Sequence, residues 1–146
     1  MKTTPPPRIR SIDHIHVYVS DRAAAERWYK RVLGFSRIKA FEFWAEDGGP
    51  LTIQNQDGTA HIALFERPAE TCHSTIALGV GADELLAWKV HLAEALGHEP
   101  ELEDHQLSVS LYFRDPDGNP YEITTYEYEA AKAGLRDRDA QLKRSA

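Results

Sequence analysis

The sequence is short of the features that mark secreted and membrane proteins. It has one cysteine, Cys72, among 146 residues, which excludes a framework of internal disulfides. Its uninterrupted apolar runs are far shorter than the roughly 20 residues that a membrane span requires. Its first residues also lack the apolar core of a secretory signal. We therefore expect a cytoplasmic protein that does not enter the membrane.

Basic residues are also in deficit. Lys and Arg total 17 against 23 Asp and Glu, a formal net charge of -6. Because an acidic surface repels phosphate groups, this balance argues against general nucleic-acid binding. The sequence contains neither a Gly-rich phosphate-binding loop nor the nucleophile elbow of serine hydrolases. It does contain seven histidines, so imidazole and carboxylate are the ligands available to a metal ion.

The first half of the chain predicts one strand, one helix and three more strands. Residues 12–19 alternate between apolar and polar side chains, which is typical of a half-buried strand with His14 and His16 on its polar face. Asp21 is a good helix N-cap, and Gly34 can end the amphipathic helix that follows. The three further strands are predicted at residues 35–44, 51–54 and 59–66.

The second half repeats this order. Val80 corresponds to Val19, and Gly97 corresponds to Gly34. The number of residues between the partners is nearly the same in the two pairs, so both halves share one plan with a small insertion. Asp83 is predicted to cap the second helix. The later strands are predicted at residues 99–104, 107–114 and 120–126. The sequence thus predicts two βαβββ modules.

Domain boundaries follow from these patterns. Three prolines favour an extended arm over residues 1–8. The folded domain is expected at residues 9–126, with the first module at 9–67 and the second at 72–126. A helical tail is expected over residues 127–146.

Three segments carry a resemblance to a known family. They are Ile-Asp-His-Ile through Val-Ser-Asp at 12–21, Trp-Tyr with Leu-Gly-Phe at 28–35, and Tyr-Phe-Arg-Asp-Pro-Asp-Gly-Asn-Pro-Tyr-Glu-Ile at 112–123. In this order they resemble the vicinal oxygen chelate superfamily, which includes glyoxalases, extradiol dioxygenases, fosfomycin-resistance enzymes and bleomycin-binding proteins. The resemblance implies an α+β fold whose two modules curve together into an open barrel around a cavity.

The resemblance also implies candidate metal ligands. His14 and Glu122 stand where metal-using members carry ligands, on the first strand of one module and the last strand of the other. The internal repeat places Thr75 opposite His14, at a position where many relatives have a second histidine. His73 shares the face of Thr75, about 6.6 Å away along the strand, and is the candidate third ligand. We rank it above His16, because imidazoles two residues apart on a strand reach one ion with difficulty.

The last strand of the first module offers no further ligand when the two modules are aligned with each other. The offset that relates Asp57 to Asp117 in the two turns also aligns Ile62 with Glu122. His61 then points to the opposite face, toward the helix layer or the solvent.

A polar stripe on the strand at 107–114 supplies candidates for proton transfer. Tyr112, with His105 just before the strand, is a candidate acid-base or orienting group. The alternative for this stripe is a face turned toward solvent or a second subunit. The candidate substrate-binding residues are His16, Thr75, Ser110 and Thr124.

Two functions from different classes remain open. The first is a metal-dependent enzyme, extradiol-dioxygenase-like or glyoxalase/lyase-like, that acts on a small oxygenated molecule. Fe(II) or Mn(II) is the favoured ion, with Zn(II) or Ni(II) as further candidates. The second is a metal-free protein that binds an aromatic or drug-like compound in the same cavity, and the departure at Thr75 is its main support. The resemblance implies a homodimer in either case.

Overall fold

The computed structural model describes residues 6, 8, 10–68, 70 and 72–145. The arm expected at residues 1–8 lies mostly outside the described residues. No helix within them is both long and apolar enough to cross a membrane.

Two modules of the same plan follow one another along the chain. The first comprises β1 (Ile15–Val19), α1 (Arg22–Leu33), β2 (Ser36–Arg37), the 3-10 helix η1 (Lys39–Ala45), β3 (Leu51–Gln54) and β4 (His61–Glu66). The second comprises β5 (Ile76–Gly79), α2 (Ala82–Leu96), β6 (Glu101–Asp104), β7 (Val109–Arg114) and β8 (Pro120–Thr125). The C-terminal helix α3 (Tyr128–Ser145) follows.

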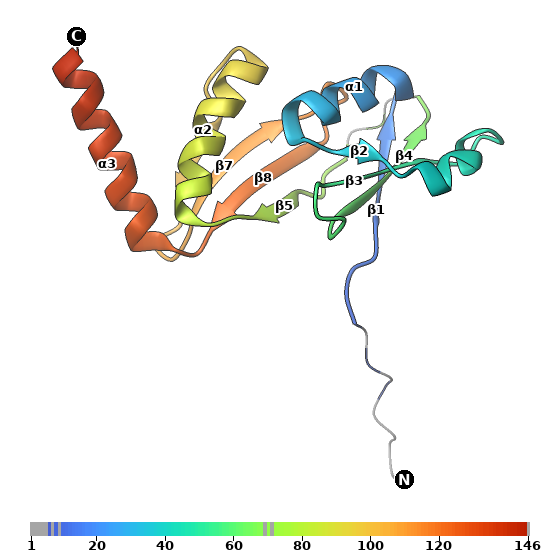
Figure 1. Ribbon diagram of the computed structural model, residues 1–146, viewed down its shortest axis with the longest axis horizontal. Helices are drawn as coiled ribbons and strands as arrows, with labels where there is room; N and C mark the ends of the chain where they lie inside the picture. The colour runs from blue at the N-terminus through green and yellow to red at the C-terminus, as the bar shows by residue number, and fades with distance from the viewer. Residues whose placement is uncertain (1–5, 7, 9, 69, 71, 146) are drawn as a thin grey trace.

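Each module forms one four-stranded sheet. The strand orders are β1-β4-β3-β2 and β5-β8-β7-β6, and in both the first strand is parallel to its neighbour while the other pairs are antiparallel. The predicted α+β fold of two βαβββ modules is therefore confirmed. The sheets curve but do not close into a barrel (Figure 1).

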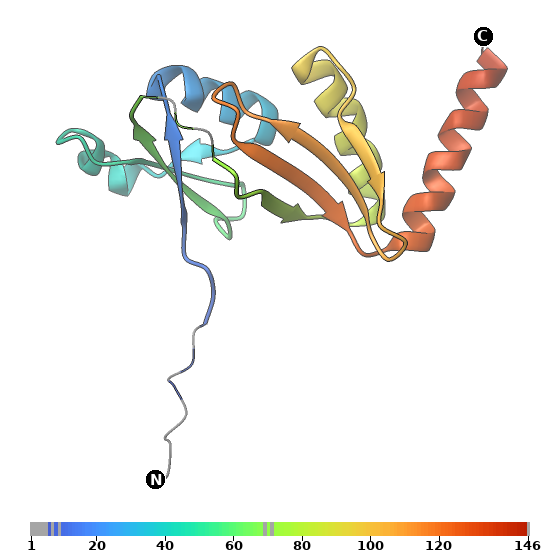
Figure 2. The ribbon, with the colours of Figure 1, turned by 180° about the vertical axis from the view of Figure 1, so that it is seen from behind.

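The helices leave one face of both sheets uncovered. Helices α1 and α2 lie on the same side of the sheets, and α3 lies beside α2 at the end away from the first module (Figures 1 and 2). The strands are apolar toward the helices. In β1, Val17 and Val19 are buried while His16 beside them is exposed; in β8, Ile123 is buried while Glu122 beside it is half-buried. The uncovered face therefore carries the polar side chains.

The turn between β7 and β8 ties the two modules together. The carboxylate of Asp115 accepts hydrogen bonds from the backbone N–H of Asn119 (2.8 Å), from its side chain (2.8 Å) and from the hydroxyl of Tyr29 on α1 (2.7 Å). The Tyr29 hydroxyl also lies 2.8 Å from that of Tyr121, and Asn119 donates to the carbonyl of Tyr18. Burial raises the pKa of Tyr29, so its hydroxyl stays a donor.

The prediction of a strand at residues 35–44 is wrong. Only Ser36 and Arg37 pair as a strand, β2, and η1 takes most of the remainder. The guanidinium of Arg22 fixes this turn by donating to the carbonyls of Gly49 (2.8 Å) and Ala45 (3.1 Å). A side chain at Gly49 would collide with the carbonyl oxygen of Trp44. A long-range contact thus overrides a local preference for strand.

The predicted cap of the second helix is also wrong. The N-cap is Gly81, and Asp83 lies inside the first turn. Carboxylates satisfy the free N–H groups instead: Glu84 accepts from Gly81 (2.7 Å), and Glu127 accepts from Ala82 (2.7 Å).

Candidate functional site

All of the predicted site residues except His73 and Thr75 fall into two groups on the uncovered face. The first group, which we call the imidazole pair, is His14 and His16 at the start of β1. The second, which we call the β7–β8 cluster, consists of His105, Ser110, Tyr112, Glu122 and Thr124. No described contact joins the two groups, and no three His, Cys, Asp or Glu side chains among the described residues converge as a metal site.

The β7–β8 cluster is one hydrogen-bonded network. Ser110 is fully buried and donates to the carboxylate of Glu122 (2.6 Å). Its oxygen lies 2.9 Å from the hydroxyl of Thr124, which donates to it because Ser110 has only one hydrogen to give. The cross-strand register places Ser110 opposite Thr124 and Tyr112 opposite Glu122. The sheet therefore orients the Glu122 carboxylate toward the uncovered face.

Tyr112 and His105 extend this network to the edge of the cluster. The Tyr112 hydroxyl lies 3.1 Å from Nε2 of His105. Partial burial, and then the negative charge of Glu122, raise the pKa of Tyr112 above its ordinary value. The phenol therefore keeps its proton and acts as a hydrogen-bond donor, with the imidazole as its acceptor when Nε2 is unprotonated.

The imidazole pair is joined by a hydrogen bond between its two rings. Nδ1 of His14 lies 2.7 Å from a carboxylate oxygen of Asp13, which leaves Nε2 for a second partner. That Nε2 lies 3.1 Å from Nε2 of His16, with the two rings stacked at 5.1 Å. The ring of His16 packs in turn on Phe65. The spacing along the strand therefore does not keep the two nitrogen atoms apart, contrary to the reason for which we ranked His16 below His73.

A small cavity adjoins His14. Its volume is about 190 Å³, and its described lining is Asp13, His14, Phe41, Trp44, Pro50, Thr52, His61 and Ala63. The presence of His61 corrects the face that we predicted for it. The register pairs Ile15 with Ile62, so Ile62 faces the helix layer and His61 lies on the same side as His14.

His73 and Thr75 are members of neither group, although Thr75 shares a cavity with Tyr112. Both are exposed in the segment that leads into β5. Thr75 lines a separate cavity of about 620 Å³ together with Tyr112 and Glu101.

The match to known families decides what kind of domain this is. The family model described as Glyoxalase/Bleomycin resistance protein/Dioxygenase superfamily matches residues 11–123. The chain belongs to this superfamily. No curated protein sequence matches it significantly.

Solved structures of the superfamily share the fold. A glyoxalase/dioxygenase from Nostoc punctiforme is 18% identical, with a TM-score of 0.65, and the match covers 86% of this chain and 97% of that one. The fosfomycin resistance protein FosX from Listeria monocytogenes, in complex with Mn(II), is 17% identical, with a TM-score of 0.61 and coverage of 85% and 96%. Lactoylglutathione lyase from Agrobacterium tumefaciens is 22% identical, with a TM-score of 0.61 and coverage of 84% and 97%.

Within this superfamily domain, sequence reasoning missed four residues of the site. Asp13 orients His14, and His61, Phe41 and Trp44 line its cavity. Only Asp13 had a local signal, an acidic residue directly before a candidate ligand. The other three reach the site through the register of β4 and the fold of η1, which no short motif encodes.

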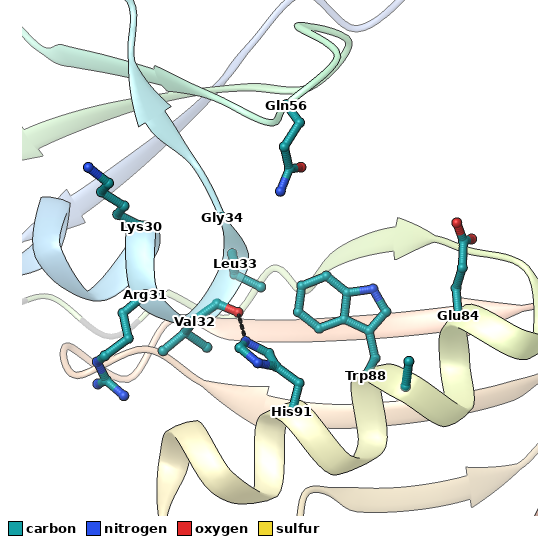
Figure 3. A pocket seen from close by; sticks show the side chains of 10 residues that line it. Lys30, Arg31, Val32, Leu33, Gly34, Gln56, Glu84, Trp88 and His91 are labelled. Atoms are coloured by element: carbon teal, nitrogen blue, oxygen red, sulfur yellow. Dashed lines mark hydrogen bonds between the residues drawn. The ribbon is translucent and has the colours of Figure 1, made fainter.

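A further cavity of the superfamily domain, about 320 Å³ in volume, lies on the helix side, away from both groups. Trp88 and His91 of α2 and Val32 and Leu33 of α1 contribute to its walls (Figure 3). His91 lies 2.8 Å from the carbonyl of Val32 and so links the two helices. None of the predicted site residues lines it.

Proposed function

We propose that this superfamily member is a metal-dependent cytoplasmic enzyme that acts on a small oxygenated organic molecule. The observation that carries the proposal is the imidazole pair, in which Asp13 occupies Nδ1 of His14 and leaves Nε2 beside that of His16. Metal-bound histidines commonly give their other ring nitrogen to a carboxylate in this way. The relative FosX was solved with Mn(II), which favours the same class of ion here.

The donor set fits a divalent cation. The imidazoles of His14 and His16, whose Nε2 atoms lie 3.1 Å apart, would supply two nitrogen donors to such an ion. We assign His14, His16 and Glu122 as ligands, with His73 as the alternative to His16. Fe(II) and Mn(II) suit imidazole with carboxylate best, and Zn(II) and Ni(II) are further candidates. When bound, the ion supplies Lewis acidity that lowers the pKa of a substrate hydroxyl.

The β7–β8 cluster supplies a hydrogen-bond donor. Tyr112 keeps its proton and donates a hydrogen bond to a substrate oxygen, and Nε2 of His105 lies beside its hydroxyl as a further acid-base candidate. Ser110 holds Glu122 in place. Thr124 and Thr75 contribute hydroxyls for substrate binding. Both extradiol-dioxygenase-like and glyoxalase/lyase-like reactions need such a positioned donor.

We propose that a second copy of the chain completes the site. The described residues of one chain bring together two imidazoles but no third ligand, and Glu122 makes no described contact with them. In a two-fold homodimer, the imidazole pair of one copy faces the β7–β8 cluster of the other. The uncovered faces of both sheets would then be the surface that the two copies share.

The second candidate is a metal-free protein that binds an aromatic or drug-like compound. Thr75 is its support, because a hydroxyl at a ligand position is a poor donor to a metal ion. The aromatic side chains beside His14 are compatible with both candidates.

Metal content distinguishes the metal-dependent enzyme from the metal-free binding protein. Protein purified without chelators and reloaded anaerobically with Fe(II) or Mn(II) is expected to hold about one ion per chain, since each chain contributes one ligand set. Elemental analysis after gel filtration measures this ratio, and chelator treatment should return it to zero. A folded protein that binds neither ion at micromolar concentration would overturn the enzyme and leave the metal-free candidate.

A further inference from the structure

The C-terminal helix α3 contacts the hairpin that carries His105. It begins at Tyr128, beyond the residues that the superfamily model matches. Its first turns lie beside the turn between β6 and β7 (Figure 2). The hydroxyl of Tyr128 (3.1 Å) and the ammonium of Lys132 (2.6 Å) donate to the same carboxylate oxygen of Asp104. Asp104 is the last residue of β6, so α3 holds the end of the strand from which His105 follows.

The same carboxylate also holds the turn in its conformation. The other oxygen of Asp104 accepts a hydrogen bond from the backbone N–H of Gln106 (2.9 Å). Of the residues that the structure describes, Gln106 is the one non-glycine residue with a left-handed backbone, at a φ of 69°. This conformation is unfavourable for a residue with a side chain and persists where neighbouring contacts hold it. Asp104 supplies such a contact.

The turn sets the position of the His105 imidazole. His105 is exposed, and its Nε2 lies 3.1 Å from the hydroxyl of Tyr112, with the two rings edge to face at 6.1 Å. Within the described part of the chain, the His105 side chain has no other hydrogen-bond partner. A ring with a single partner at the surface is not fixed by packing, so its place depends on the backbone that carries it.

Helix α3 is itself firmly attached, because it packs along α2. Ala131 is fully buried, and a side chain at Gly134 would collide with Leu86 of α2. The guanidinium of Arg138 donates to the carbonyl of Leu86 (2.9 Å). The Asp104 carboxylate is therefore joined to the helix layer through α3.

The charge of Asp104 persists throughout the pH range in which histidines titrate. Hydrogen bonds from Lys132, and then from the N–H of Gln106, lower the pKa of Asp104 to about 2. The side chains of Asp104 and Lys132 are 34% and 32% exposed, and ion pairs at the surface are weak and screened by salt. Such contacts contribute little to the stability of the domain. They can still decide which of two places an exposed imidazole occupies.

We propose that Asp104 is a positioning residue for His105, and that α3, through Tyr128 and Lys132, keeps this imidazole against the Tyr112 hydroxyl. The inference rests on the proposed function for the chemical role of His105 and Tyr112. The position of the imidazole depends on neither metal nor substrate, so it is tested on the metal-free full-length chain. A failure to bind Fe(II) or Mn(II) would therefore leave this result unchanged.

The test is ¹⁵N NMR of the histidine side chains at about pH 8.5, well above the ordinary pKa of histidine. Because the Tyr112 hydroxyl donates to Nε2, wild-type His105 is expected mainly as the tautomer protonated at Nδ1. Asp104→Ala removes the contacts with Gln106, Tyr128 and Lys132 and should lower the ratio of Nδ1–H to Nε2–H about tenfold. An unchanged ratio in Asp104→Ala would overturn the proposal.

Variants of the ion pair assign the effect to α3. Lys132→Ala should lower the tautomer ratio of His105 about two- to fivefold, and Lys132→Arg should keep most of it. Lys89→Ala is the matched control, because Lys89 of α2 forms a surface ion pair with Glu99 (2.8 Å) and has no described contact with the β6–β7 turn. It should leave the ratio unchanged. Equal effects of Lys132→Ala and Lys89→Ala would contradict the role of α3.

A conservative variant separates the two functions of the carboxylate. Asp104→Asn keeps an oxygen that can accept from the N–H of Gln106 but removes the charge that pairs with Lys132. Its tautomer ratio should therefore fall between those of the wild type and Asp104→Ala. A ratio equal to that of the wild type would show that the turn alone positions His105 and would overturn the part of α3.

Discussion

Replacing His14 with alanine is expected to weaken Mn(II) binding more than about 100-fold. Loss of an outer partner of a metal ligand typically costs about 10–100-fold in affinity, and loss of the ligand itself costs more. Asp13→Asn keeps the shape of the side chain but weakens its hydrogen bond to Nδ1 of His14. It should therefore lower Mn(II) affinity by about 10–100-fold. Isothermal titration of metal-free protein measures both affinities.

Further histidine variants make this test selective. His98→Ala is the control, because His98 is exposed and lies near a backbone carbonyl outside the imidazole pair, so Mn(II) affinity should be unchanged. His16→Ala should approach the effect of His14→Ala, and His73→Ala should not. A large loss in His73→Ala with none in His16→Ala would reverse our choice of ligand. Unchanged affinity in His14→Ala would remove the imidazole pair from the metal site.

Removing the carboxylate of Asp115 is expected to cause a large loss of stability. It is 5% exposed and accepts hydrogen bonds from two backbone N–H groups, the Asn119 side chain and Tyr29. Because each buried donor left unpaired costs roughly 1–3 kcal/mol, Asp115→Ala should lower the free energy of unfolding by about 3 kcal/mol or more. Domains of this kind are stable by only about 5–15 kcal/mol, so urea denaturation resolves the change clearly.

The first module supplies a matched control for this prediction. Asn55 begins the corresponding turn, and its side-chain oxygen accepts from the backbone of Thr59 (2.9 Å) and Ala60 (3.1 Å). It makes no described contact with the other module. Because water can reach the donors that Asn55→Ala leaves unpaired, this variant should cost only about 1 kcal/mol. Equal losses in the two variants would contradict the view that the β7–β8 turn holds the modules together.

The repeat explains why so much of the fold is readable from sequence. Strands β1, β3 and β8 and both module helices are indicated by alternation or helical periodicity, and glycines in the left-handed conformation at positions 34 and 97 end the helices. The aromatic segment at residues 35–44 is misread, because Phe and Trp favour strands locally. What makes it a 3-10 helix is a guanidinium from α1, a contact between residues far apart in the sequence.

The candidate site is harder to predict from the sequence than the fold, because it depends on which residues of neighbouring strands lie side by side. The offset between the two turns aligns Ile62 with Glu122, whereas the offset that relates His14 to Thr75 is larger by one and aligns His61 with Glu122. A shift of one residue moves a side chain to the other face of a strand. Glu122 is placed by the local turn motif before its strand, so its placement does not depend on aligning the two modules. Its hydrogen-bond partner Ser110 belongs to the polar stripe that the sequence predicts on the neighbouring strand, as does Tyr112.

The most direct test of the two-copy metal site mixes two inactive variants. His14→Ala lacks the imidazole, and Glu122→Gln lacks the carboxylate, so neither should bind Mn(II) alone. After the two are unfolded together and refolded, we expect about a quarter of the wild-type binding capacity, because half of the dimers are mixed and one of their two sites is complete. A mixture of His14→Ala with His16→Ala, whose changes fall in the same half-site, should recover none. If the first mixture also recovers none, the site is not formed between His14 of one copy and Glu122 of another.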